Sequence, residues 1–93
     1  MTKYHIKLSP IAEFQLDEWK RNGTKSVLKK LANLFDELEK HPTTGTGKPE
    51  KLRGDLQGYW SRRITKADRM IYKIEDKLVV VDIISLMGHY GDK

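Results

Sequence analysis

Residue types able to take part in cleaving a phosphodiester occur at three places in the sequence, at Glu50, at Arg69 and at the pair His89-Tyr90. Glu50 is the only acidic residue within residues 48–53, and a carboxylate among cations stays ionised and can accept a proton. His89 has the side chain best suited to donate a proton near neutral pH, and Tyr90 beside it can donate a hydrogen bond or stack on a base. RNA carries its own nucleophile, the 2′-hydroxyl. A base, an acid and cations that hold the phosphorane charge would therefore be enough, without a metal or cofactor.

Each of these residues also has an ordinary interpretation. A lone glutamate such as Glu50 is commonly part of a surface salt bridge. Arg69 opens a predicted strand, where a basic residue also keeps the strand edge soluble. A histidine near a chain end, such as His89, often has no role. The residue types alone leave these alternatives open.

The positive charge of the chain is concentrated in one segment. The chain has 18 Lys and Arg against 13 Asp and Glu, a net charge of +5. Residues 48–73 contain eight basic and three acidic residues, so this segment accounts for the entire excess. A local positive field suits a polyanion, with nucleic acid as the first candidate and a solvated strand edge as the alternative.

Length and composition predict one α+β domain over residues 1–93. The absence of cysteine excludes disulfides and thiolate metal sites, and three scattered histidines give no metal site. There is no apolar run of membrane-spanning length and no secretory leader, which is typical of a cytoplasmic protein.

The first half of the chain predicts a strand and a helical hairpin. Apolar and polar residues alternate over residues 4–8, as in a strand with one buried face. Ser9-Pro10 has the residue types of a helix N-terminus, and the first helix should extend to about Arg21. The side chains expected to face the core from this helix are Ile11, Phe14 and Trp19.

The second helix has the clearest periodicity in the chain. Apolar residues recur at three- and four-residue steps from Val27 to Leu38, which predicts an amphipathic helix. Thr24 is a suitable N-cap, and the helix should end before Pro42. Residues 42–49 are then expected to form a loop.

Three strands are predicted in the second half, over residues 59–64, 69–74 and 78–86. The short turns between them require antiparallel neighbours, and the strongly apolar last strand should lie inside the sheet. The predicted order is β-α-α-β-β-β, an antiparallel sheet with the helical hairpin on one face. The alternation of side chains places Arg62 on the helix-covered face, and Arg63 and Arg69 together on the open face.

Several segments together resemble one family. The runs GKPEKLRGDLQGYWSRRIT, DRMIYKI and the final GHY are similar to the YoeB/Txe toxins of the RelE superfamily. The specific matches lie within residues 42–90, and the N-terminal half agrees in pattern. The predicted order of elements also agrees with the RelE-like fold.

The resemblance implies a toxin of a type II toxin–antitoxin system, an endoribonuclease that cleaves messenger RNA in the ribosomal A site. It implies that Glu50 is the general base, that Arg69 stabilises the transition state, and that His89 is the general acid beside Tyr90. The basic residues that it implies for ribosomal or messenger phosphates are Lys48, Arg53 and Arg63.

The implied partners are the ribosome with its message and a cognate, YefM-like antitoxin with an acidic, disordered segment; a homodimer is also possible. The residues by themselves leave two other functions open. A ParE-like inhibitor of DNA gyrase would share the fold without the acid–base residues. A plain RNA-binding module would use the basic strands without any chemistry.

Overall fold

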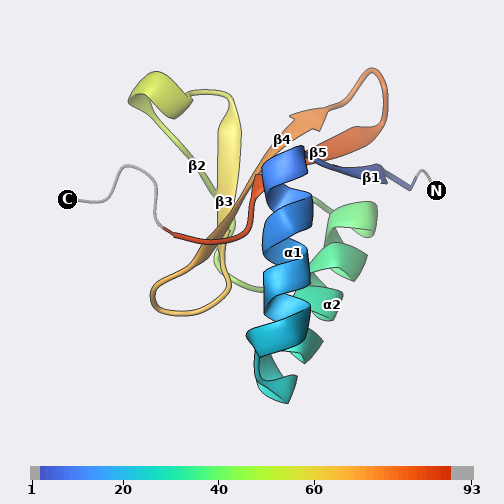
Figure 1. The fold of residues 1–93 in the computed structure, drawn as a ribbon. Coiled ribbons are helices and arrows are strands. Elements are labelled where there is room, and N and C mark those ends of the chain that lie inside the picture. The colour runs from blue at the N-terminus through green and yellow to red at the C-terminus, as the bar shows by residue number, and fades with distance from the viewer. Residues whose placement is uncertain (1–2, 89–93) are drawn as a thin grey trace.

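Two helices pack side by side against one face of a five-stranded sheet (Figure 1). The computed structural model describes residues 3–88. The elements in chain order are β1 (His5–Leu8), α1 (Pro10–Asn22), α2 (Lys25–Lys40), β2 (Glu50–Lys51), a short 3-10 helix η1 (Gly54–Leu56), β3 (Tyr59–Arg63), β4 (Arg69–Glu75) and β5 (Val80–Ser85). No helix in this part of the chain is long and apolar enough to cross a bilayer.

The strand order in the sheet is β1-β5-β4-β3-β2. Strands β3, β4 and β5 are antiparallel neighbours, as predicted, and β5 lies inside the sheet between β1 and β4. The sheet is mostly antiparallel, as predicted, and the exception is β1, which pairs in parallel with β5. Because the helices and three other strands separate β1 from β5, no tight turn fixes their relative direction.

Strand β2 is an addition to the predicted order, which becomes β-α-α-β-β-β-β. It consists of Glu50 and Lys51 alone, paired antiparallel with Ser61 and Trp60 of β3. Two charged residues after a proline show no apolar alternation, so the sequence gives no sign of a strand here. The pairing matters because it brings Glu50 into the sheet.

Both helices begin at the predicted residues. The Ser9 hydroxyl accepts a hydrogen bond from the Ala12 amide at 3.0 Å, with Pro10 in the first turn of α1. The Thr24 hydroxyl likewise accepts from the Val27 amide at 3.2 Å and caps α2. Local sequence therefore determines where both helices start.

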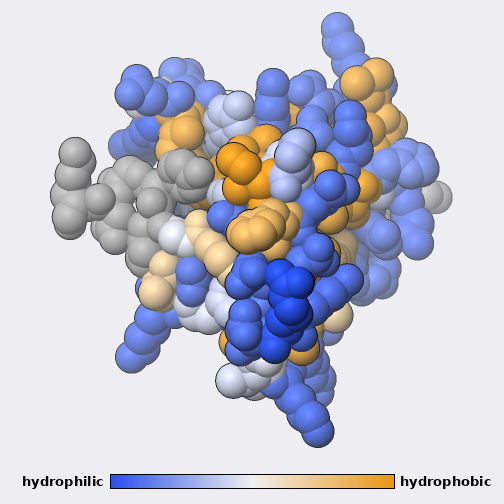
Figure 2. All heavy atoms as spheres, viewed as in Figure 1, coloured by the Kyte–Doolittle hydropathy of each residue, from blue (hydrophilic) through white to orange (hydrophobic). Residues whose placement is uncertain are grey.

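The predicted orientation of α1 is wrong for two residues. Ile11 and Phe14 are 61% and 62% exposed, whereas Ala12 is fully buried. Leu16 and Trp19 follow Ala12 at steps of four and three residues and pack against the core, so the apolar stripe of α1 begins at Ala12. Figure 2 shows hydrophobic surface exposed over the N-terminal part of α1.

The core lies between the helices and the sheet. Helix α2 buries Leu31, Leu34 and Leu38 on the face that its periodicity predicts. The strands contribute alternate residues to the same cluster, namely Met70, Tyr72, Val81 and Ile83, and Ile64 joins them just after the end of β3. Burying this apolar surface is the main favourable contribution to folding.

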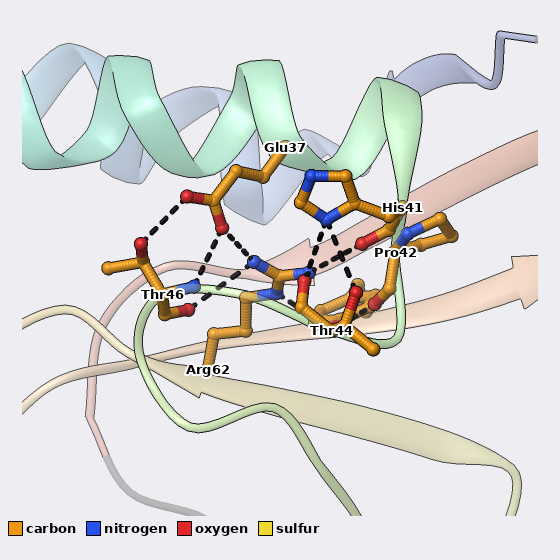
Figure 3. A network of polar contacts seen from close by, with 7 residues as sticks. Glu37, His41, Pro42, Thr44, Thr46 and Arg62 are labelled. Atoms are coloured by element: carbon orange, nitrogen blue, oxygen red, sulfur yellow. Dashed lines mark hydrogen bonds and ion pairs between the residues drawn. The ribbon is translucent and has the colours of Figure 1, made fainter.

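Arg62 is buried among these apolar residues with no exposed surface. It lies on the helix-covered face, as the alternation in β3 predicts. Its Nη1 donates to Glu37 Oε1 of α2 at 2.7 Å (Figure 3). A buried charge is tolerated when it is paired and fully hydrogen-bonded, and this ion pair meets that condition.

The ion pair predicts how the stability of the fold depends on pH. Burial of Glu37 raises its pKa, but hydrogen bonds from Thr46 and Arg62 outweigh burial and hold the pKa of Glu37 below its ordinary value of 4.5. The folded-state pKa is the lower one. Ionised Glu37 therefore stabilises the fold fully above pH 4.5, and this stabilisation is lost as the pH falls through the folded-state pKa.

We therefore expect Glu37→Gln to flatten the acid limb of the stability curve. The measurement is the free energy of unfolding in urea at a series of pH values, for wild type and Glu37→Gln. The matched control is Asp36→Asn, which removes an exposed partner of Lys40 on the same helix and should leave the acid limb steep. Parallel curves for wild type and Glu37→Gln would contradict this assignment.

Candidate active site

The candidate site lies on the face of the sheet that the helices do not cover. Directly paired residues of antiparallel strands project from the same face, and Glu50 pairs with Ser61 while Arg63 pairs with Arg69. Because the pairing of β3 with β4 is regular over these residues, all four project from one face. The predicted grouping of Arg63 with Arg69 is confirmed, and Glu50 joins them through β2.

Glu50 and Arg69 form the closest pair of opposite charges at this site. Arg69 Nη1 lies 3.9 Å from Glu50 Oε1, and the Glu50 side chain is 64% exposed against 24% for Arg69. A contact this long and this exposed contributes little to stability. Among the described residues, neither side chain makes a hydrogen bond, so both can bind a polar group of another molecule.

A wide groove of about 1220 Å³ runs beside this pair, along β2, η1 and the start of β3. Its lining includes Glu50, Arg53, Tyr59, Trp60, Ser61 and Arg69. The Lys51 ammonium lies 5.9 Å from the centre of the Trp60 ring, within cation–π range. The groove thus combines one carboxylate, several cations and aromatic surface, a set of groups that suits RNA phosphates and bases.

The predicted phosphate-binding residues divide into two groups. Arg53 lines the groove itself. Arg63 and Lys48 are exposed but lie outside its lining, Arg63 next to Arg69 in the sheet and Lys48 two residues before Glu50. From these positions, both side chains can reach a polyanion that is long enough to extend beyond the groove.

The predicted acid His89 and its neighbour Tyr90 lie outside the described residues. The last described residue, Gly88, is hydrogen-bonded beside Arg69. The Arg69 amide donates to the Gly88 carbonyl at 3.0 Å, and the Gly88 amide donates to Asp68 Oδ1 at 2.9 Å. The described chain therefore ends at the start of β4, next to one member of the Glu50–Arg69 pair.

Sequence reasoning missed one feature in the site and one on the opposite face of the sheet beside it. Ser61 lies in the groove lining with its hydroxyl fully buried and without a hydrogen-bond partner among the described residues. Arg62, the next residue, is the centre of a buried polar network. The only signal in the sequence was the alternation in β3, which places Ser61 on the open face and the charged Arg62 on the apolar face.

A helical hairpin packed on one face of a small, mostly antiparallel sheet is the architecture of a RelE-like α+β protein. Residues 13–90 match the family described as YoeB-like toxin of bacterial type II toxin–antitoxin system. The chain belongs to this family. It is thus a toxin of the toxin–antitoxin type, as the sequence resemblance predicted.

Individual relatives agree with the family match. Toxin YoeB from Streptomyces coelicolor is 45% identical over 64 residues, which are 68% of this chain and 75% of that protein. The solved YoeB/ParE toxin from Agrobacterium tumefaciens superposes with a TM-score of 0.83 at 31% identity, covering 92% of this chain and 99% of that one. Toxin YoeB from Staphylococcus aureus, solved in a YoeB–YefM complex, gives a TM-score of 0.79 at 33% identity and covers 96% of this chain and all of that chain (100%).

Proposed function

We propose that this chain is a ribosome-dependent endoribonuclease that cleaves messenger RNA in the ribosomal A site and so inhibits translation. The observation that supports it most is the Glu50–Arg69 pair, 3.9 Å apart, in an open groove lined with basic and aromatic residues. A base and a cation beside each other are what attack on a phosphodiester requires. Membership of the toxin family agrees with this activity.

In the proposed reaction Glu50 takes the proton of the substrate 2′-hydroxyl, and the 2′-oxygen attacks the adjacent phosphorus. Arg69 donates hydrogen bonds to the non-bridging oxygens, where negative charge accumulates. His89 gives a proton to the departing 5′-oxygen, with Tyr90 beside it. The bond from phosphorus to the 5′-oxygen breaks, and the products are a 2′,3′-cyclic phosphate and a 5′-hydroxyl.

Three further basic residues would bind the substrate and the ribosome. Arg53, which lines the groove, and Arg63, which pairs with Arg69, would contact phosphates of the message near the scissile one. Lys48 would contact phosphates further out. Because these contacts release counterions, binding should weaken steeply as the salt concentration rises.

The test is primer extension on a defined message, with the purified chain added to translating ribosomes or to the same RNA alone. We expect cleavage of the translated message, weak cleavage of free RNA, and a 2′,3′-cyclic phosphate at the new end. Inhibition of DNA supercoiling without RNA cleavage would favour a gyrase inhibitor instead. Salt-dependent RNA binding without cleavage would favour a plain RNA-binding module.

We also propose that a cognate, YefM-like antitoxin binds this chain. The similar S. aureus toxin occurs in a complex with YefM and also as a dimer. An acidic, disordered segment would complement the basic groove. The exposed apolar side chains of α1, Ile11 and Phe14, offer a second contact, since clustered apolar surface marks interaction sites.

Phe14→Glu should therefore weaken the complex with the antitoxin by about tenfold or more, because a charge replaces an apolar contact. Phe14 is 62% exposed, so the fold should not change. Leu78→Glu is the matched control, since Leu78 is 70% exposed in the turn between β4 and β5. Calorimetric titration with the antitoxin measures both. An unchanged affinity for Phe14→Glu would show that this surface does not bind the antitoxin. A shift in the monomer–dimer equilibrium of the chain alone would assign the surface to a second copy of the chain.

A further inference from the structure

The buried network around Arg62 ties helix α2 and strand β3 to the loop that leads into β2. All five N–H groups of the Arg62 guanidinium are used. Nη1 donates to Glu37 Oε1 at 2.7 Å and to the Thr46 carbonyl at 3.3 Å, and Nη2 donates to the His41 and Thr44 carbonyls at 3.0 and 2.7 Å. Nε donates to the Tyr72 hydroxyl at 3.1 Å. Three loop carbonyls are thus held by one buried side chain.

Its two polar partners, Glu37 and Tyr72, hold the same loop. Glu37 accepts hydrogen bonds from the Thr46 amide at 2.8 Å and from the Thr46 hydroxyl at 2.7 Å. The Tyr72 hydroxyl donates to the Pro42 carbonyl at 2.7 Å. Figure 3 shows Glu37 above and Arg62 below the loop, with both directed toward Thr46. We call these three side chains and their loop contacts the Arg62 clamp.

The chain lies directly against β3 where it leaves the clamp. The Arg63 amide donates to the Gly47 carbonyl at 2.7 Å. Gly47 has a φ of +85°, and a Cβ there would lie 2.8 Å from the Arg63 carbonyl oxygen, so the close approach requires glycine. The loop therefore has little freedom at Gly47.

Only two residues separate this point from Glu50. Lys48 has the left-handed φ of +53°, and Pro49 has its φ fixed by the ring. Strand β2 is two residues long and lies at the edge of the sheet, so its own pairing holds Glu50 weakly. The position of Glu50 then depends mainly on what fixes the loop before it.

We propose that Arg62 and Glu37 are positioning residues that place the Glu50 carboxylate against Arg69 by fixing the loop between α2 and β2. Neither residue lines the groove, and neither is required to touch RNA. A buried ion pair adds little net stability compared with apolar packing, so its value here lies in fixing one loop geometry. The part of this inference that is tested by catalysis rests on the proposed nuclease function.

The test compares Glu37→Gln and Arg62→Lys with two controls. Asp36→Asn breaks the neighbouring exposed ion pair on α2, and Val81→Ala weakens the core on β5, away from the loop. Cleavage is assayed at a temperature at which every variant is folded. We expect kcat to fall about 10- to 100-fold for Glu37→Gln, with KM unchanged, because a misplacement of about 1 Å costs up to about 100-fold. Arg62→Lys should lose more, since an ammonium cannot reach all the acceptors.

Hydrogen exchange provides a readout that does not depend on catalysis. The amides to follow are those of Arg63, bonded to Gly47, and Leu52, bonded to the Tyr59 carbonyl at 2.9 Å beside β2. Both should exchange faster in Glu37→Gln than in wild type and at the wild-type rate in Asp36→Asn. If Glu37→Gln exchanged faster but even the wild-type chain did not cleave RNA, the role of the clamp in fixing the loop would be supported and the nuclease function would be rejected.

Three results would overturn the inference. The first is a folded Glu37→Gln variant with wild-type kcat. The second is unchanged exchange at Arg63 and Leu52. The third is an equal loss of kcat in a Val81→Ala variant of equal stability, which would reduce the clamp to a general contribution to folding.

Discussion

Replacing Glu50 by glutamine should lower kcat for cleavage of a translated message by about 100- to 10,000-fold, the range that a general base contributes. Glutamine keeps the size and the hydrogen-bonding shape of the side chain but cannot accept a proton from the 2′-hydroxyl. Because Glu50 is mostly exposed and its contact with Arg69 is 3.9 Å long, folding should be unaffected. The measurement is primer extension under single-turnover conditions, with thermal melting of both proteins.

The matched control for this variant is Asp55→Asn. Asp55 is another acidic residue of this basic segment, lies in η1, is exposed, and is not part of the groove lining. Its replacement changes the net charge by the same amount. If Asp55→Asn lost as much activity as Glu50→Gln, the effect would be one of charge, and Glu50 would not be the base.

Arg69→Gln should lower kcat by about 100- to 1000-fold, the cost of removing one preorganised donor to a developing oxyanion. Arg69 is only 24% exposed at the start of β4, and its backbone is hydrogen-bonded to Gly88, so the point from which its side chain extends is fixed. Arg69→Lys should recover part of the loss, because it restores the charge without the planar fork. Single-turnover kinetics at saturating ribosome measure this effect.

Arg63 provides the comparison that separates catalysis from binding. It pairs directly with Arg69 across β3 and β4 and has the same charge, but it is exposed and outside the groove lining. Arg63→Gln should raise KM and reduce the salt dependence, with little change in kcat. Identical kinetic profiles for the Arg63 and Arg69 variants would remove the special role of Arg69.

The sequence by itself determined the parts of the molecule that depend on near neighbours. Ser9-Pro10 and Thr24 begin the helices, since a hydroxyl there reaches an amide three residues on. The three- and four-residue spacing in α2 selects its buried face. Alternation in β3 and β4 puts Arg63 and Arg69 on the open face and Arg62 on the other. Each of these patterns spans only a few residues, so it can be read without knowledge of the tertiary arrangement.

Only the tertiary structure decided how distant segments meet. The apolar stripe of α1 begins at Ala12 and excludes Ile11 and Phe14, because the sheet determines which side of a weakly patterned helix is covered. The parallel pairing of β1 with β5 follows from how the chain packs, and the two-residue β2 forms because it pairs with β3. The local sequence contains no signal for either. The Arg62–Glu37 contact joins residues 25 positions apart.

The candidate site divides in the same way. The residue types and the family resemblance selected Glu50 and Arg69, but their separation of 3.9 Å depends on β2, on the loop before it and on the clamp that holds the loop. Hydrogen bonds between residues far apart in sequence form only after the chain has collapsed around its core, so no spacing in the sequence encodes them directly. The sequence thus supplied the candidate reacting groups, and the folded loop brings them close together.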